Sequence, residues 1–366
     1  MPRVIGIDPG TVSIDLCGLD DGRVFLDQSL PTSDALANPS VLAGLLDEAH
    51  QATPLDLVAG PSGYGLPLVR ARDVTEHDIR LAQLTAEGET SGGIGGLGSL
   101  MRMLSRSSLP IIFTPGVIHL ASVPAHRKVN RVDMGTADKV CAVALAVHEQ
   151  AQRLGCSERD VSFIQLELGG AFTAAVAVEH GRIVDGAGGT SGALGLRSAG
   201  ALDGEVAFLA GSVSKGLLFT GGVAAIAGPP DGPAAAIADP RTPRDQLARE
   251  AYLEGVVKAV ALLAVSAPAA REVILSGRAA RIAGVRDELA RRLTGVAAGA
   301  PVHVLTGFAT VAKQAAQGAA LVADGLAGGT SAALVDTLGI REASGTVLDH
   351  LYVISQAAAR ARLGMT

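Results

Sequence analysis

The sequence predicts an α/β protein built from two similar domains, and three observations support this fold class. A short apolar strand at residues 4–7 runs into Asp8-Pro9-Gly10-Thr11, and a second strand at 13–19 completes a hairpin. A shift of 159 residues places Glu167 on Asp8 and Gly169 on Gly10, with a Gly-Arg turn at the same distance in both copies. The chain has 366 residues, which is the length of two domains. We therefore predict a duplicated domain whose hairpin tips face each other across a cleft.

A hairpin tip of this composition has the groups that bind the phosphates of a nucleotide. Its glycine lets the backbone approach phosphate oxygens, the Thr11 hydroxyl can donate a hydrogen bond, and a carboxylate can hold Mg2+ through its water ligands. The second tip offers Gly169, Gly170 and Thr173 for the same purpose. The carboxylates of the two tips, Asp8 and Glu167, are the candidate metal ligands.

The paired tips resemble the two phosphate motifs of the acetate-and-sugar-kinase, heat-shock-chaperone and actin (ASKHA) superfamily. The motifs stand here as Asp8-Pro9-Gly10-Thr11 and as Glu167-Leu168-Gly169-Gly170-Ala171-Phe172-Thr173. The stretches NRVDMGTADK and GALDGEVAF are similar to those of a mainly prokaryotic branch labelled predicted butyrate kinases.

The resemblance implies two ribonuclease-H-like (actin-like ATPase) domains around a nucleotide cleft, with ATP and Mg2+ as cofactors. It also implies a kinase that transfers the γ-phosphoryl group of Mg-ATP to a small-molecule carboxylate or hydroxyl acceptor. The sequence departs from the superfamily at Glu167, where Asp is usual. The extra methylene group moves the carboxylate by roughly 1.5 Å.

Composition restricts the other classes of partner. A net charge of −6, no Trp and 3% aromatic residues argue against nucleic-acid binding. The apolar stretch 256–266 contains Lys258 and precedes Pro268, so it is too short to span a membrane. Three widely spaced cysteines match no metal or redox motif, and no signal peptide precedes the first strand, which together predict a cytoplasmic protein. The sequence is also compatible with a homodimer.

The first predicted domain covers residues 1–155. After the hairpin we expect a third strand at 24–30, a helix at 38–52 that starts with Asn38-Pro39, and a buried strand at 55–59. This is the order of a ribonuclease-H-like half in the resemblance. Residues 60–130 depart from it and are predicted to be an insert that selects the acceptor.

The insert contains a G-x-G-x-x-G pattern at Gly93, Gly95 and Gly98, but no strand precedes it. We therefore interpret it as a loop before a helix at 97–105, and not as a dinucleotide site. A strand at 109–113 comes next, followed by His119, His126, Arg127, Lys128 and Arg131. These cations are either a solvated loop or contacts for an anionic substrate or the transferring phosphoryl group. Our candidate substrate contacts are Arg127, Lys128, Asp133 and Thr136.

A run of eight apolar residues at 140–147 predicts a helix that is buried on every side. The resemblance makes it the first helix that connects the two domains. Asp138 and Lys139 lie in its first turn, where they form either a cap with a salt bridge or a catalytic, substrate-positioning pair, which we favour. Further along, Asp203 either caps the element at 206–210 or serves as a general base.

The second predicted domain covers residues 156–330. It contains the second hairpin, a glycine-rich loop after residue 185, a helix at 244–266, a strand at 272–275 and a helix at 280–293. Ser276, Gly277 and Arg278 join the last two elements and resemble the adenosine motif of the superfamily. A strand at 302–305 leads to a helix at 310–326, whose small residues around Gly318 allow close contact with a neighbouring helix. Residues 331–366 are predicted to be a C-terminal helical segment with a helix at 347–363.

Three functions are compatible with these patterns. The first is the small-molecule kinase described above, with Asp138, Lys139 and Asp203 as candidate catalytic residues. The second is a nucleotide-gated ATPase that drives a conformational change in a partner protein. The third is an ATP-binding protein with weak catalysis, for which Glu167 is the only indication.

Overall fold

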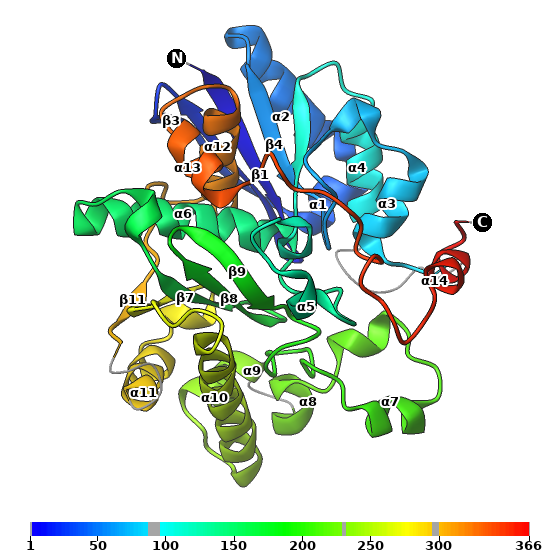
Figure 1. The fold of residues 1–366 in the computed structure, drawn as a ribbon, viewed down its shortest axis with the longest axis vertical. Helices are drawn as coiled ribbons and strands as arrows, with labels where there is room; N and C mark the ends of the chain where they lie inside the picture. The colour runs from blue at the N-terminus through cyan, green and yellow to red at the C-terminus, as the bar shows by residue number, and fades with distance from the viewer. Residues whose placement is uncertain (1, 87–95, 229–231, 295–299, 366) are drawn as a thin grey trace.

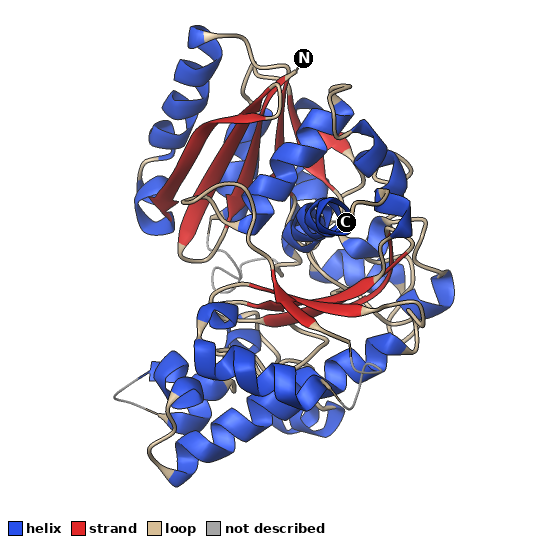
Figure 2. Ribbon diagram, turned by 90° about the vertical axis from the view of Figure 1, so that its left-hand side faces the viewer, coloured by secondary structure: helices blue, strands red, loops and turns tan. Residues whose placement is uncertain are grey.

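Two β-sheets, one above the other, form the centre of the molecule in a computed structural model (Figure 1). The structure describes residues 2–86, 96–228, 232–294 and 300–365. Figure 2 shows the sheets as separate layers, with helices between them and on their outer sides. The predicted α/β fold of two domains is confirmed. Gly93 and Gly95 of the predicted loop lie outside the described residues.

The first sheet has the strand order β3-β2-β1-β4-β6-β5. Strands β1, β4 and β6 are parallel, and β2, β3 and β5 each pair antiparallel with a neighbour. The strand bounds are β1 (Arg3–Pro9), β2 (Ser13–Asp20), β3 (Arg23–Pro31), β4 (Leu57–Pro61), β5 (Val69–Arg70) and β6 (Ile111–Thr114). Because β6 continues the parallel core of this sheet, residues 111–114 belong to the basic fold and not to the predicted insert.

The second sheet has the order β11-β10-β7-β8-β9, which matches β6-β4-β1-β2-β3 of the first. Its strands are β7 (Phe163–Leu168), β8 (Thr173–Glu179), β9 (Arg182–Ala187), β10 (Glu272–Ser276) and β11 (Val302–Val304). The repeat extends to single residues. Pro9 pairs with Ile14 as Leu168 pairs with Thr173, and the register shifts between Gly18 and Leu19 as it does between Ala177 and Val178.

The turn that follows the second strand is also repeated. Asp21 and Gly22 have φ angles of 53° and 72°, and His180 and Gly181 have 51° and 69°. Two successive positive φ angles are typical of the tight hairpin turn that fits the twist of the strands. The shift of 159 residues therefore reproduces turn, bulge and register, which confirms the duplication.

Helices cover both sheets. Their bounds are α1 (Thr32–Ala37), α2 (Pro39–Ala52), α3 (Glu76–Gln83), α4 (Leu97–Ser105), α5 (Ala125–Lys128), α6 (Ala137–Leu154), α7 (Gly204–Ala210), α8 (Val223–Ala227), α9 (Gly232–Ala238), α10 (Pro243–Ala264), α11 (Ala283–Leu293), α12 (Gln314–Leu326), α13 (Ala332–Leu338) and α14 (Gln356–Arg362). Helix α1 was not expected from the sequence. The predicted helix at 347–363 is reduced to the single short helix α14.

Helix α6 crosses the molecule between the two sheets and contacts strands of both (Figure 1). Its residues from Val140 to Val147 are all buried, as predicted. On the facing side of the second sheet, Val176 and Val178 join the core that contains α6, whereas Ala175 and Ala177 face the core around α10. This alternation is that of a strand covered on both faces, so α6 holds the two domains together through a shared core.

Helix α12 packs on α6 and on β1, β2 and β4 of the first sheet. It therefore lies with the first domain, although the predicted second domain extends to residue 330. A Cβ added at Gly318 of α12 would lie 1.7 Å from the Cys141 carbonyl oxygen of α6. A Cβ added at Gly6 of β1 would lie 2.2 Å from the Ala316 carbonyl oxygen of α12. Only glycine fits at these contacts, which confirms the predicted close approach of the two helices.

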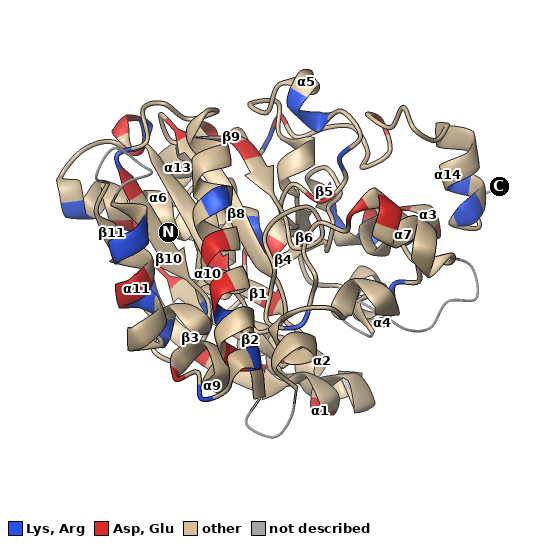
Figure 3. Ribbon diagram, turned by 90° about the horizontal axis from the view of Figure 1, so that it is seen from below, with Lys and Arg blue, Asp and Glu red and all other residues tan. Residues whose placement is uncertain are grey.

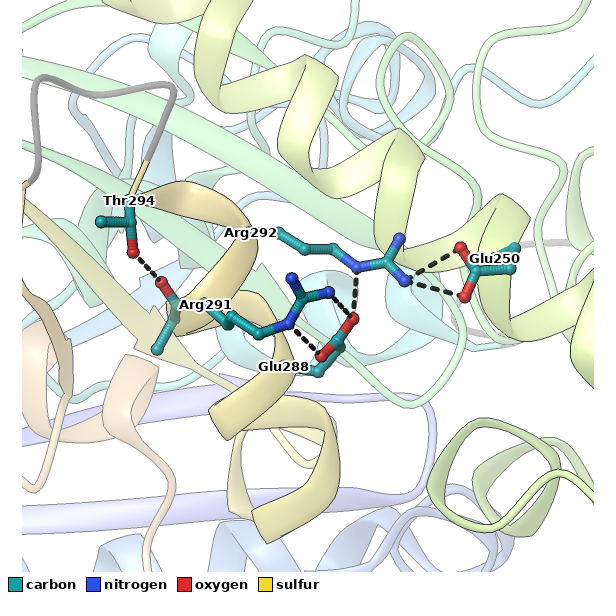
Figure 4. A network of polar contacts seen from close by, with 6 residues as sticks. Glu250, Glu288, Arg291, Arg292 and Thr294 are labelled. Atoms are coloured by element: carbon teal, nitrogen blue, oxygen red, sulfur yellow. Dashed lines mark hydrogen bonds and ion pairs between the residues drawn. The ribbon is translucent and has the colours of Figure 1, made fainter.

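On the outer side of the second sheet, ion pairs join α11 to α10 (Figure 4). Arg292 contacts Glu250 of α10 and Glu288 of its own helix at 2.7 Å each, and Arg291 contacts Glu288 at 2.6 Å. In the view from below, α10 and α11 carry residues of both charge signs (Figure 3). Among the helices that the structure describes, none is both long and apolar enough to cross a membrane.

The close contact between α12 and α6 predicts that one added methyl group at Gly318 destabilises the protein. Gly318→Ala is expected to lower the free energy of unfolding by about 3 kcal/mol, since the helices must separate or strain to admit it. Gly44→Ala in α2 is the matched control, because a Cβ there meets nothing within 4 Å. This variant should be more stable than the parent by about 0.5–1 kcal/mol, since alanine favours the helix. Urea unfolding measures both, and equal stability of Gly318→Ala and the parent would contradict the packing described.

Candidate active site

A cleft lies between the two hairpin tips, the start of α6 and the segments around α3 and α4. Its lining includes both predicted phosphate tips, the first turn of α6 and the turn after β10. The residues that line it are Asp8, Pro9, Gly10, Thr11, Val12, Pro61, Gly63, Tyr64, Ala82, Gln83, Thr85, Leu97, Asp133, Thr136, Asp138, Lys139, Glu167, Gly169, Gly170, Ala171, Phe172, Gly189, Thr190, Phe219, Gly277, Arg278 and Lys313.

The two tips have the same backbone geometry. The N–H group of Gly10 donates to the Ser13 carbonyl at 2.9 Å, and that of Gly169 donates to the Phe172 carbonyl at 3.0 Å. These two N–H groups close the turns, so they are not available to a ligand. The N–H groups of Thr11 and Gly170 have no hydrogen-bond partner in the described part of the chain. A phosphate would therefore meet the amides of the residues that follow the first glycine of each tip.

Thr173 does not reach the cleft. Its side chain is buried in β8 and its hydroxyl faces that of Tyr252 inside the second domain. The last residue of the superfamily motif, Thr173, is therefore not a phosphate contact in this structure.

Lys139 joins the two sides of the cleft. Its Nζ donates to Glu167 Oε1 at 2.9 Å, and also to the carboxylate of Asp138. Thr136 Oγ1 donates to the other oxygen of Asp138. Burial alone would raise the pKa of Asp138, but the charge of Lys139 and these hydrogen bonds outweigh burial and hold that pKa below its usual value. Burial likewise acts to lower the pKa of Lys139, and the two carboxylates raise it. Both groups are therefore charged at neutral pH.

Asp8 is the acid on the first tip and is only 6% exposed. Burial and the nearby charge of Asp138 raise the pKa of Asp8 to about 7, against the opposing effect of Lys313 and Lys139. The cleft lining thus contains the carboxylates of Asp8, Asp138 and Glu167, whereas the Lys139 ammonium already pairs with two of them and the Lys313 ammonium pairs with Asp15. A further cation would relieve this excess of negative charge.

The charge excess fits Mg2+ bound at Asp8 and Glu167. Among the residues that the structure describes, no three His, Cys, Asp or Glu side chains form a ready-made metal cluster. Mg2+ in phosphate sites uses one or two carboxylates and takes its other ligands from water and phosphate oxygens. Two carboxylates on opposing tips provide the protein share of such a site.

The turn after β10 packs directly on the second tip. Gly277 has a φ of 85°, and an added Cβ would lie 2.5 Å from the Leu168 carbonyl oxygen, so glycine is required here. Gly277 and the exposed Arg278 line the cleft. Ser276 does not, because its buried hydroxyl accepts from Gln165 Nε2 at 3.2 Å within the second sheet. Of the three predicted adenosine contacts, two are therefore placed to meet a ligand.

Besides Thr173 and Ser276, three further predicted site residues lie away from the cleft lining. Arg127 donates to the Val184 carbonyl at 2.8 Å, and the buried Lys128 Nζ donates to the Leu120 carbonyl at 3.0 Å. Both tie their segment to the protein. Asp203 accepts from the N–H groups of Glu205 and Val206 at 2.8 and 3.3 Å, so it caps α7. Of the two roles considered for Asp203, helix cap and general base, the geometry supports the helix cap.

Asp133 and Thr136 do reach the cleft. The carboxylate of Asp133 accepts from the N–H and the hydroxyl of Thr190 at 2.9 Å each, which fixes the glycine-rich loop after β9 against the segment before α6. Asp133 therefore shapes the site wall as well as lining it.

Several lining residues were not expected from the sequence. Phe172 and Phe219 form an edge-to-face pair with ring centroids 4.7 Å apart, and the Lys215 ammonium lies 4.3 Å from the ring centroid of Tyr64. Phe172 stands within the second tip and could have been found there. Tyr64, Phe219 and Lys313 come from distant segments that no local motif marks. Leu97, Ala82 and the aromatic residues form the apolar part of the cleft lining.

The raised pKa of Asp8 predicts a pH-dependent effect of Asp8→Asn on stability. Between the ordinary carboxyl value of 3.8 and about 7, the folded chain keeps a proton at Asp8 that the unfolded chain has lost. The free energy of unfolding of the parent therefore falls as pH rises through this window, and the Asn variant lacks this contribution. From pH 5 to pH 7 the variant should gain about 2–3 kcal/mol over the parent, at about 1.4 kcal/mol per pH unit. Urea unfolding at pH 5, 6, 7 and 8 measures the gain, and a pH-independent difference would exclude a protonated Asp8.

Comparison with solved structures places this fold. A propionate kinase from Francisella tularensis subsp. tularensis superposes with a TM-score of 0.63 at 14% identity, over 87% of this chain and 99% of that one. An acetate kinase from Porphyromonas gingivalis gives 0.60 at 14% identity, over 87% and 98% of the two chains. An acetate kinase from Entamoeba histolytica gives 0.57 at 12% identity, over 80% and 86%. The predicted fold of two ribonuclease-H-like domains is therefore confirmed.

Comparison of the sequence with curated proteins gives no match. A family model described as "Protein of unknown function (DUF1464)" matches residues 6–353, which is nearly the whole chain. The protein therefore belongs to the DUF1464 family.

Proposed function

We propose that this protein is an ATP-dependent phosphotransferase that passes the γ-phosphoryl group of Mg-ATP to a small acceptor with a carboxylate or hydroxyl group. The observation that carries the proposal is the meeting of both phosphate tips, each with its carboxylate, in one cleft with the Asp138–Lys139 pair. The fold shared with acetate and propionate kinases over most of the chain supports it.

The protein binds and orients the phosphates in this proposal. The free amides of Thr11 and Gly170 bind phosphate oxygens from opposite sides, and the Arg278 side chain lies beside the second tip. Asp8 and Glu167 hold Mg2+ through water, and the bound metal ion neutralises charge on the phosphates. Gly277 and Arg278 border the adenosine. Phosphoryl transfer depends on such positioning and charge neutralisation more than on covalent chemistry.

Asp138 and Lys139 lie at the place where the acceptor meets the phosphate. With its pKa held low, Asp138 is ionised, so it orients an acceptor hydroxyl or accepts its proton. A carboxylate acceptor needs no base, and Lys139 then provides the positive charge that brings two anions together. The apolar lining residues Tyr64, Phe172 and Phe219 suit an acceptor with a short hydrocarbon portion.

A second candidate is an ATP-binding protein with little transfer activity. The observation that favours it is the ion pair between Glu167 and Lys139, which occupies one of the two metal ligands. Under this candidate, Mg-ATP binds to the cleft but the acceptor panel does not stimulate release of ADP.

The test of the proposed function is release of ADP from Mg-ATP by the purified protein, alone and with panels of carboxylic acids and polyols. We expect one acceptor class to stimulate release and to carry the phosphate, detected by mass spectrometry of the products. Steady release that no acceptor changes would instead indicate an ATPase that acts on a partner.

Asp8→Asn should lower this turnover by about 100-fold, because it removes a carboxylate that orients the metal-bound water. Asp21→Asn is the matched control, since Asp21 is an exposed residue in the turn at the far end of the same hairpin. Turnover of the control should equal that of the parent. Full activity of the Asp8→Asn variant would contradict the assignment of the cleft as the reaction site.

A further inference from the structure

Lys313 is a cation of the cleft that the proposed function has not used. It immediately precedes α12, at the end of the segment that returns from β11 of the second sheet, and it reaches the first tip. Its Nζ lies 2.9 Å from Asp15 Oδ2 and 3.2 Å from the Ser13 carbonyl oxygen. An ammonium group has three donors, and no third partner is present among the described residues. The side chain is 32% exposed, so the remaining donor is accessible from the cleft.

The backbone before Lys313 is fixed by three side chains from different elements. Glu149 of α6 accepts from the N–H groups of Thr306 and Gly307, and Gln317 of α12 accepts from the next two. Asp27 of β3 then accepts from the N–H groups of residues 310, 311 and 312, at 2.7–3.2 Å. These bonds leave residues 306–312 little freedom, so the position of Lys313 is built into the fold.

The first tip makes room for this ammonium. A Cβ added at Gly10 would lie 2.7 Å from Lys313 Nζ, whereas at the matching Gly169 the close atom is the Phe172 carbonyl oxygen of the same turn. Asp15, which pairs with Lys313, is only 1% exposed, and the matching residue of the second hairpin is Ala174. The hairpin therefore forms without an acid at this position. The Asp15–Lys313 ion pair is specific to the first tip and positions the Lys313 ammonium there.

We propose that Lys313 binds a phosphate oxygen of the nucleotide on the first tip through its third N–H donor, as Asp15 and Ser13 hold the other two. This inference rests on nucleotide binding in the cleft, as proposed above. Lys139 is already engaged by Asp138 and Glu167, and Arg278 lies on the second tip. Lys313 is thus the cation that serves the first tip, where the amide of Thr11 is its neighbour.

The test separates a phosphate contact from a purely structural ion pair. Lys313→Met leaves Asp15 buried without its partner and should lose stability, whereas Lys313→Met combined with Asp15→Asn removes both charges and should recover it. Calorimetry then measures the affinity of each protein for Mg-ATP. Competition between adenosine and Mg-ATP measures the affinity for adenosine, which has no phosphate. We expect both variants to bind Mg-ATP about 10- to 100-fold more weakly, since a charged hydrogen bond is lost, and to bind adenosine like the parent.

Two controls complete the experiment. Lys258→Met removes an exposed lysine that pairs with Glu254 on α10, and its affinity for Mg-ATP should not change. Lys313→Arg keeps the charge and should retain most of the affinity. If the parent binds Mg-ATP and the stable double variant binds it equally well, Lys313 is structural and the inference is wrong. If the parent itself binds no Mg-ATP, both the inference and the proposed function are overturned.

Discussion

Burial of α6 between the two sheets is the constraint on which the rest of the structure depends. The helix has apolar residues on every face, so it is stable only when both domains cover it. The two hairpins thereby face each other, and the first turn of α6 lies at the mouth between them. Helix α12 is locked against α6 by contacts that admit only glycine at Gly318. The shape of the cleft is therefore a consequence of the core.

Once the domains are held together, charge determines what the cleft can bind. Asp8, Asp138 and Glu167 come from three different elements, and Lys139 compensates two of them. Burial and the nearby charge of Asp138 raise the pKa of Asp8 to about 7. In a metal-bound polyphosphate the metal ion supplies positive charge beside the carboxylates, and the free amides of Thr11 and Gly170 offer positive dipoles for the phosphate oxygens. These charges and dipoles support the metal-bound nucleotide that we propose as the ligand.

The sequence was a good guide wherever the structure is local or repeated. A sequence offset of 159 residues carries the strand register, the bulge and the turn of the first hairpin onto the second. This works because neighbouring residues determine the geometry of a hairpin. The tips, Asp138–Lys139 and Gly277 could be placed from motifs for the same reason. Lys313, Tyr64 and Phe219 could not, because chain crossings between distant elements bring them to the cleft. Arg127 and Lys128 show the reverse error, since a cluster of cations does not reveal which carbonyl groups will bind them.

The most direct test of the account is a crystal structure of the protein with Mg2+ and a non-hydrolysable ATP analogue. We expect phosphates between the amides of Thr11 and Gly170, the metal ion beside Asp8 and Glu167, and the adenosine along Gly277 and Arg278. A nucleotide bound outside the cleft, or bound by only one of the two tips, would contradict it.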